Sequence, residues 1–234
     1  MNKREENGEQ QPLEDQPAET AIEAVSVALS AVPVAGGPLA EIAGAIIRRR
    51  QNRRLNRFLI DLAGDLQRLS DRVNSEFVRT DEFQDLAEDI LTKATETRQQ
   101  AKLDAFRAIF LNTVLAQRPN YNEASEIATL VDRLQEQHIA LLRILADPRR
   151  ADREMGRPVG EGGGFATSIN QILRRLLPEW DDDQIDRTWA DLLDVKIHNT
   201  PGTKAMMTDS GVHQLENRLT PFGWKVVRYI TSPT

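Results

Sequence analysis

Residues 32–50, VPVAGGPLAEIAGAIIRRR, decide how the N-terminal part of the chain folds. Two prolines and a glycine pair interrupt an apolar sequence, which then runs into three arginines. Because proline and glycine break helices, we expect two short helices, at residues 21–32 and 38–47, joined as a hairpin. Helices of this length reach about 18 Å and about 15 Å, whereas the hydrocarbon core of a bilayer is about 30 Å thick. Neither helix can therefore span a membrane alone.

The apolar residues of this hairpin recur at helical spacing and form one stripe on each helix. As candidate residues for membrane insertion or for an interface they are Ile22, Val25, Leu29, Val32, Leu39, Ile42 and Ile46. If the chain continued as one helix, the stripe that contains Leu62 and Leu66 would point to nearly the opposite side. We therefore expect either a bend near the arginines, or an apolar partner for the hairpin in another subunit, a lid of helices or lipid.

Six arginines with no acid among them follow the hairpin, and they are candidate membrane-binding or anion-binding residues. They are Arg48, Arg49, Arg50, Arg53, Arg54 and Arg57. Anionic lipid head groups attract such clusters by about 1 kcal/mol per charge near the surface. A solvated helix face that pairs with acids is the ordinary alternative, and docking of protein or nucleic acid is the third.

Composition limits the class of protein. Residues 1–20 hold six acids and two bases with few apolar side chains, which predicts a disordered acidic tail. The formal net charge of −6 argues against general binding to nucleic acids, so we expect DNA as a partner less than membrane or protein. The chain lacks cysteine, and its charged N-terminus does not look like a secretory signal. We expect a cytoplasmic protein that is peripheral to the inner membrane.

Helical periodicity continues through the middle of the chain. Apolar residues at three- and four-residue spacing predict a long helix over residues 55–77, and Thr80 is the expected N-cap of the next helix. Further stripes cover residues 103–114 and 127–145. Residues 148–166 hold five glycines and two prolines, which predicts a linker.

The C-terminal part combines helices with strand-like segments. Asp181–Asp183 are expected to cap a helix, residues 195–200 and 212–220 to form a small β-hairpin, and residues around Trp224 to form a closing helix. We therefore predict a mainly α protein, an antiparallel helical bundle with a C-terminal winged-helix-like α+β unit. The predicted parts are a tail (1–20), a hairpin plus bundle (21–147), a linker (148–166) and the winged-helix-like unit (167–234).

Three motifs in this region are similar to known proteins. They are HIALLRIL at 138–145, WADLLDVKI at 189–197 and RLTPFGWKVVRYI at 218–230. Together they resemble Abi-alpha proteins, a bacterial helical family linked to abortive infection. Leu219, Thr220 and Gly223 are also similar to the exit of a wing strand in winged-helix regulators. The resemblance implies a role in phage defence and supplies no active site.

No set of residues in the sequence is typical of catalysis. His138 fits the apolar stripe of a helix, while His198 and His213 lie on the two expected strands, and none belongs to a zinc motif. The glycine-rich segment lacks the Lys and Ser or Thr of a phosphate-binding loop. We therefore predict no catalytic residues, no metal, no cofactor and no enzymatic activity.

These observations predict a phage-defence effector that acts at the inner membrane through the hairpin and the arginines. The alternatives are a winged-helix regulator that binds DNA and a protein-interaction adaptor or oligomeric scaffold. The expected partners are accordingly an anionic membrane surface, a partner protein or further copies of the chain in a homo-oligomer.

Overall fold

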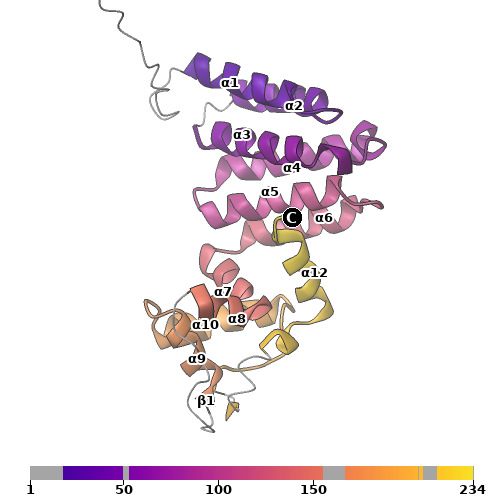
Figure 1. The fold of residues 1–234 in the computed structure, drawn as a ribbon. Helices are drawn as coiled ribbons and strands as arrows, with labels where there is room; N and C mark the ends of the chain where they lie inside the picture. The colour runs from indigo at the N-terminus through magenta and orange to yellow at the C-terminus, as the bar shows by residue number, and fades with distance from the viewer. Residues whose placement is uncertain (1–17, 50–52, 155–166, 205, 208–214, 234) are drawn as a thin grey trace, which may run out of the picture. The chain divides into compact units, whose positions relative to one another are not determined.

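The computed structural model describes residues 18–49, 53–154, 167–204, 206–207 and 215–233. The protein is mainly helical, and the chain divides into two compact units (Figure 1). Unit 1 contains residues 1–96 and 114–121, and unit 2 contains residues 97–113 and 122–234. This division differs from the predicted one, whose boundary lay at the linker. Residues 1–17 of the predicted tail and 155–166 of the predicted linker lie outside the described residues.

Unit 1 consists of two pairs of helices. Its elements are α1 (Ala18–Ser30), α2 (Gly36–Arg49), α3 (Arg53–Arg68), the 3₁₀ turns η2 (Ser70–Arg72) and η3 (Phe77–Arg79), and α4 (Asp81–Glu96). Helix α1 packs against α2 and α3, and α2 packs against α4, so the hairpin forms a layer over the second pair (Figure 1). The core of the unit lies between these layers and contains side chains such as Leu29, Leu39, Leu62 and Phe83.

The turn between α1 and α2 is tight. The Gly36 amide donates to the Val32 carbonyl at 3.2 Å, and the Ala35 amide donates to the Pro33 carbonyl at 2.7 Å. Val34 has a φ of 66°, which is a rare conformation for a β-branched residue. A Cβ atom on Gly36 would lie 2.0 Å from the Leu29 carbonyl oxygen. Only glycine therefore permits this approach of α2 to the last turn of α1.

The chain changes direction at the arginines. Helix α2 ends at Arg49 and α3 begins at Arg53, so the two are separate helices and the first predicted alternative, a bend, is confirmed. Because of that bend, the stripes that would diverge on one continuous helix enter the same core. The reasoning that the hairpin stripe requires an apolar surface outside the chain is therefore corrected.

The helix predicted over residues 55–77 is shorter in the structure. Helix α3 ends at Arg68, and the side-chain oxygen of Asn74 accepts from the amides of Glu76 at 3.1 Å and Phe77 at 3.0 Å. These local bonds satisfy the backbone outside a helix. The next boundary was predicted correctly, since the Thr80 hydroxyl accepts from the Phe83 amide at 3.3 Å at the start of α4.

Unit 2 is organised around α7. Its elements are α5 (Gln100–Val114), α6 (Tyr121–Arg133), α7 (Glu136–Ala146), α8 (Pro148–Glu154), β1 (Thr167–Ser168), α9 (Ile169–Leu176), α10 (Asp182–Asp194), β2 (Met206–Met207), η4 (Leu215–Arg218) and α12 (Pro221–Ile230). Helix α7 packs against α8, α10, α12 and η4. The Asn112 amide donates to the carbonyls of Arg228, Tyr229 and Thr231, which fixes the C-terminal end of α12 to α5.

One prediction for unit 2 is corrected, and another is not shown. The stripe over residues 127–145 belongs to two helices, because Gln135 and His138 form a reciprocal capping box that starts α7. The expected winged-helix β-hairpin is not shown. Residues 195–200 and 215–220 are joined by the isolated bridge between His198 and Leu219, while β2 pairs antiparallel with β1. Residues 208–214 lie outside the described part of the chain.

The close contact in the hairpin turn gives the first testable prediction. Gly36→Ala forces the new methyl group against the Leu29 carbonyl, and we expect the free energy of unfolding of unit 1 to fall by about 1–3 kcal/mol. Gly37→Ala is the matched control, because nothing lies within 4 Å of its added Cβ. Urea unfolding followed by circular dichroism measures both variants. Equal midpoints for the two alanine variants would contradict the assigned contact.

Candidate functional site

The structure places most of the predicted insertion residues in the core of unit 1. Val25, Leu29 and Leu39 are exposed by only 2%, 1% and 0%, and Val32 is also buried. Ile42 and Ile46 are half-buried, and the side chain of Ile22 lies outside the described residues. Val25, Leu29, Val32 and Leu39 are therefore covered by the chain itself and offer no free surface in this conformation.

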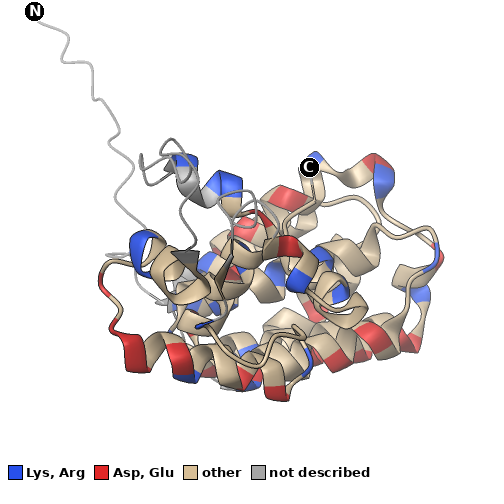
Figure 2. Ribbon diagram, turned by 90° about the horizontal axis from the view of Figure 1, so that it is seen from below, with Lys and Arg blue, Asp and Glu red and all other residues tan. Residues whose placement is uncertain are grey.

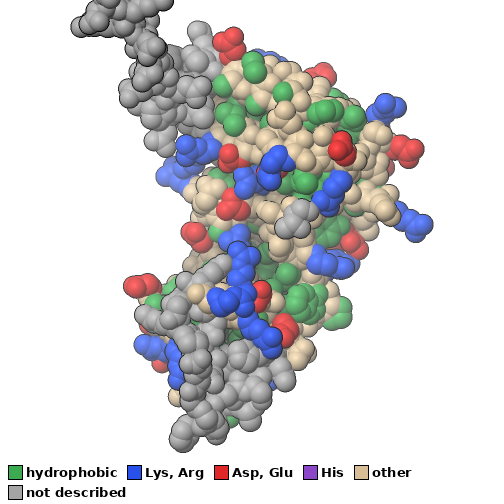
Figure 3. Space-filling model, in the orientation of Figure 1, with side chains coloured by type: hydrophobic (Ala, Val, Ile, Leu, Met, Phe, Trp, Pro, Cys, Tyr) green, Lys and Arg blue, Asp and Glu red, His purple; other side chains and the backbone are tan. Residues whose placement is uncertain are grey.

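The outer face of the hairpin, opposite its buried stripe, is the surface that α1 and α2 leave exposed. Val27 is 63% exposed and Val34 is 50% exposed, and they are two of the four large hydrophobic residues exposed in the described chain. From Ala24 to Ala40 the sequence contains no ionisable side chain. Over α1 and α2 the surface is mostly uncharged (Figure 3). The hairpin is consequently apolar in its core, and the part of its outer face between the exposed Glu23 and Glu41 carries no charge.

Sequence reasoning missed this outer face. The stripe analysis selects residues that recur at helical spacing, and it therefore assigns Val27 to the polar side of α1. The available signal was the long interval without charge between Glu23 and Glu41. In a surface helix the outward face normally carries charged or strongly polar residues. Here Ser26 and Ser30 are the most polar exposed side chains between Glu23 and the turn.

The arginine cluster lies at the other end of α2 from the hairpin turn. Arg48, Arg54 and Arg57 are exposed, and the Arg48 guanidinium lies over Gly44, one turn earlier in α2. The side chains of Arg49, Arg50 and Arg53 lie outside the described residues. Because α2 rises 1.5 Å per residue, about 18 Å separates Arg48 from the turn. The cations thus lie at one end of the uncharged hairpin.

Acidic side chains dominate α10 in unit 2. Asp181 caps the helix as predicted, because its carboxylate accepts from the Gln184 amide at 2.7 Å. Asp183 and Asp194 are exposed, and Asp182 pairs with Arg174 at 2.9 Å, which lowers the pKa of Asp182. Figure 2 shows acidic and basic positions on many elements, and α4 in unit 1 is similarly acidic, with six acids and one lysine. A helix with this charge repels the phosphates of DNA.

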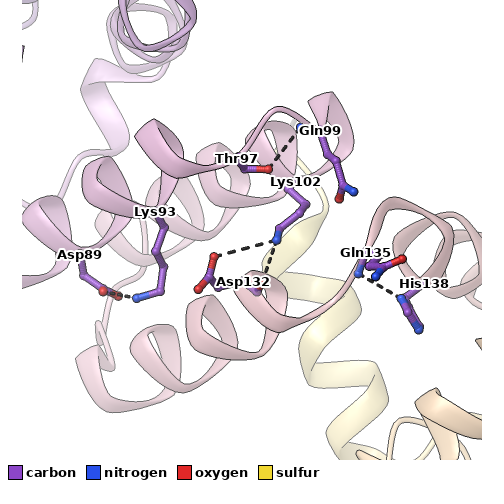
Figure 4. A network of polar contacts seen from close by, with 8 residues as sticks. All are labelled: Asp89, Lys93, Thr97, Gln99, Lys102, Asp132, Gln135 and His138. Carbon is purple, nitrogen blue, oxygen red and sulfur yellow. Dashed lines mark hydrogen bonds and ion pairs between the residues drawn. The ribbon is translucent and has the colours of Figure 1, made fainter. Parts of the chain in front are cut away.

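His138 and Asp191 form a polar contact that resembles a catalytic dyad. The His138 Nε2 lies 3.0 Å from Asp191 Oδ2, and His138 Nδ1 accepts from the Gln135 amide at 3.0 Å (Figure 4). Both ring nitrogens are therefore already bonded within the protein. A general base needs one nitrogen directed at a substrate, so this geometry favours a structural role for His138.

His198 is buried beside Trp189. Its Nε2 lies 2.9 Å from the Trp189 carbonyl oxygen, and its Nδ1 accepts from the Thr200 amide at 3.3 Å. The centroids of the His198 and Trp189 rings are 4.2 Å apart. Burial lowers the pKa of His198, although the bond to the Trp189 carbonyl acts in the opposite direction. The neutral imidazole therefore belongs to the core of unit 2.

The described residues contain neither a metal-binding cluster nor a membrane-spanning helix. No group of three or more histidine, aspartate or glutamate side chains there is arranged to hold a metal ion. None of the described helices combines the length and the hydropathy needed to cross a membrane.

Comparison of the chain with family models, curated proteins and solved structures found no match. The similarity of the three C-terminal motifs to Abi-alpha proteins therefore stays a prediction. The function has to be argued from the hairpin, its arginines and the surfaces of unit 2.

The buried His198 gives a pH-dependent prediction. Because its pKa in the folded protein lies below the ordinary histidine value of 6.5, the unfolded chain binds the proton more readily as the pH falls below that value. We expect stability to be lost from about pH 6.5 downward, by at most about 1.4 kcal/mol per pH unit from this group. Urea unfolding at pH 7.5 and 5.5 should show a smaller decrease for His198→Gln than for the unsubstituted protein. An identical decrease in both would contradict a depressed pKa.

Proposed function

We propose that this protein is a phage-defence effector of the Abi-alpha type that binds the inner membrane through the outer face of its hairpin. The observation that carries the proposal is the uncharged surface between Glu23 and Glu41, with Val27 and Val34 exposed over an already buried stripe. Exposed apolar patches of this kind are typical of interaction or membrane surfaces. The defence role rests on the resemblance of the C-terminal motifs.

The arginines support a membrane as the surface that the hairpin meets. A protein partner would need its own complementary shape, whereas an anionic bilayer offers both apolar and negatively charged groups over a wide area. Arg48 lies in the last turn of α2, and Arg54 and Arg57 lie in the first turns of α3, so all three cations adjoin the hairpin in the sequence. The hairpin would lie in the head-group region without crossing the bilayer.

Unit 2 contributes a further part of the proposal, a winged-helix-like arrangement. The element order α7, β1, α9, α10 and α12 supports it, as does the His198–Leu219 bridge, next to which the Asn199 amide donates to the Arg218 carbonyl at 3.1 Å. The acidic α10 favours contact with protein over DNA. We therefore place unit 2 as a protein-contact module, in a cytoplasmic protein that is peripheral to the membrane.

Binding to vesicles tests the proposal. We expect the full chain to co-sediment with phosphatidylglycerol-containing vesicles, and Val27→Asp combined with Val34→Asp to weaken binding about tenfold or more, because two carboxylates must then enter the interface. Met206→Asp is the matched control, since Met206 is 65% exposed in unit 2. In phage-challenged bacteria the hairpin variant should also lose protection, and the control variant should keep it.

Several results would overturn the proposal. They include absence of co-sedimentation with anionic vesicles and equal loss of binding for the hairpin and Met206 variants. A third is a homo-oligomer that dissociates in the hairpin variant and does not bind vesicles, which would assign the face to a second copy of the chain. Sedimentation velocity without lipid distinguishes that outcome.

A further inference from the structure

Unit 2 contains a groove that the proposed membrane function does not use. Its volume is about 630 Å³, and it is lined by one face of α6, by the end of α10 and by the start of α12. The apolar lining consists of Leu130, Val195 and Phe222. The charged lining has two side chains of each sign. Glu126 and Arg133 come from α6, and Asp194 and Lys196 come from the end of α10 and the residues after it.

The walls of the groove are held by specific contacts. The Lys225 ammonium pairs with a Glu123 carboxylate oxygen at 2.7 Å, which joins α12 to α6 and lowers the pKa of Glu123. The Thr220 hydroxyl donates to the Lys196 carbonyl at 2.6 Å, which joins the start of α12 to the end of α10. Because these bonds exist without a ligand, the groove is already formed and a ligand would lose little free energy in ordering it.

Lys196 adopts a conformation that usually belongs to glycine. Its φ is 63°, and it follows α10 in a Schellman motif in which the Lys196 and Ile197 amides donate to the Leu193 and Leu192 carbonyls at 2.9 Å each. Strained backbone of this kind gathers at functional positions. At Lys196 it places an exposed lysine on the wall of the groove.

The charges on α6 have a defined spacing. Glu126 and Arg133 are seven residues apart, so they lie two turns apart on the same side of the helix, with about 10.5 Å between their backbone positions. Leu130 lies between them on the same face. Both charged side chains are exposed, and no ion pair joins either of them to another described residue.

We propose that this groove binds an amphipathic helix of a partner protein. On a partner helix that lies along α6, a cation and an anion about seven residues apart are also separated by about 10.5 Å. The cation can then pair with Glu126 while the anion pairs with Arg133. Apolar side chains on the face between them would contact Leu130, Val195 and Phe222. Charges of both signs favour such a peptide over nucleic acid or anionic lipid head groups, whose charge has one sign.

A pair of peptides tests the inference. Both are helical, about 15 residues long and identical in composition, with leucines on one face. One carries Lys before Glu at a separation of seven residues, and in the other the two are exchanged. Fluorescence anisotropy should show that the full chain prefers one peptide by about tenfold, whichever direction the bound helix takes. Glu126→Arg combined with Arg133→Glu should reverse the preference.

A matched control keeps the result interpretable. Glu88→Arg combined with Arg98→Glu also exchanges an exposed acid and an exposed base, but neither residue lines the groove. This variant should keep the original preference, and circular dichroism should show all three proteins folded. Equal affinity for the two peptides, failure to bind either, or an unchanged preference in the groove variant would overturn the inference. Vesicle binding is measured separately, so the membrane proposal and the groove proposal can each fail without the other.

Discussion

The contact between Gly36 and the Leu29 carbonyl is the constraint on which unit 1 depends. It lets the first turn of α2 lie against the last turn of α1, where any side chain would collide with the backbone. The two apolar stripes of the hairpin then face the same way and are buried over α3 and α4. Once the stripes are satisfied inside the protein, what distinguishes the hairpin is the uncharged stretch of its outer face between Glu23 and Glu41.

A related contact organises unit 2. A Cβ atom on Gly223 would lie 2.1 Å from the Ile197 carbonyl oxygen, so α12 can begin directly against the segment that follows α10. Thr220 caps α12 and also donates to the Lys196 carbonyl, which fixes the same junction by hydrogen bonds. The groove beside this junction is therefore part of the framework of the unit. Membrane binding and protein binding are assigned to different units and can be tested apart.

The sequence predicted the elements that depend on local chemistry. Caps at Thr80 and Asp181 were identified because a hydroxyl or carboxylate preceded an acidic first turn. The two helices of the hairpin also follow from proline and glycine, whereas the bend near the arginines was one of two alternatives that the direction of the stripes left open. The mainly helical fold was predictable from the same periodicity.

Other features depended on contacts that periodicity does not report. Helix α3 ends at Arg68, and beyond it Asn74 bonds to the amides of Glu76 and Phe77 in a non-helical segment. Helix α6 separates from α7 because Gln135 and His138 cap each other. Among the described residues, the predicted strands around His198 show one bridge, and β2 pairs with β1. The stripe identified the side of the hairpin that the protein buries, whereas the proposed membrane contact uses the exposed side, which a stripe does not select.

The central claim is that the outer face of the hairpin enters the membrane surface while unit 2 stays in water. The chain has no cysteine, so Val27→Cys and, separately, Met206→Cys each provide one site for a polarity-sensitive fluorophore. On addition of anionic vesicles, the account predicts a blue shift and higher intensity for the probe at residue 27, and no change at residue 206. An unchanged spectrum at residue 27, or equal shifts at both residues, would contradict it.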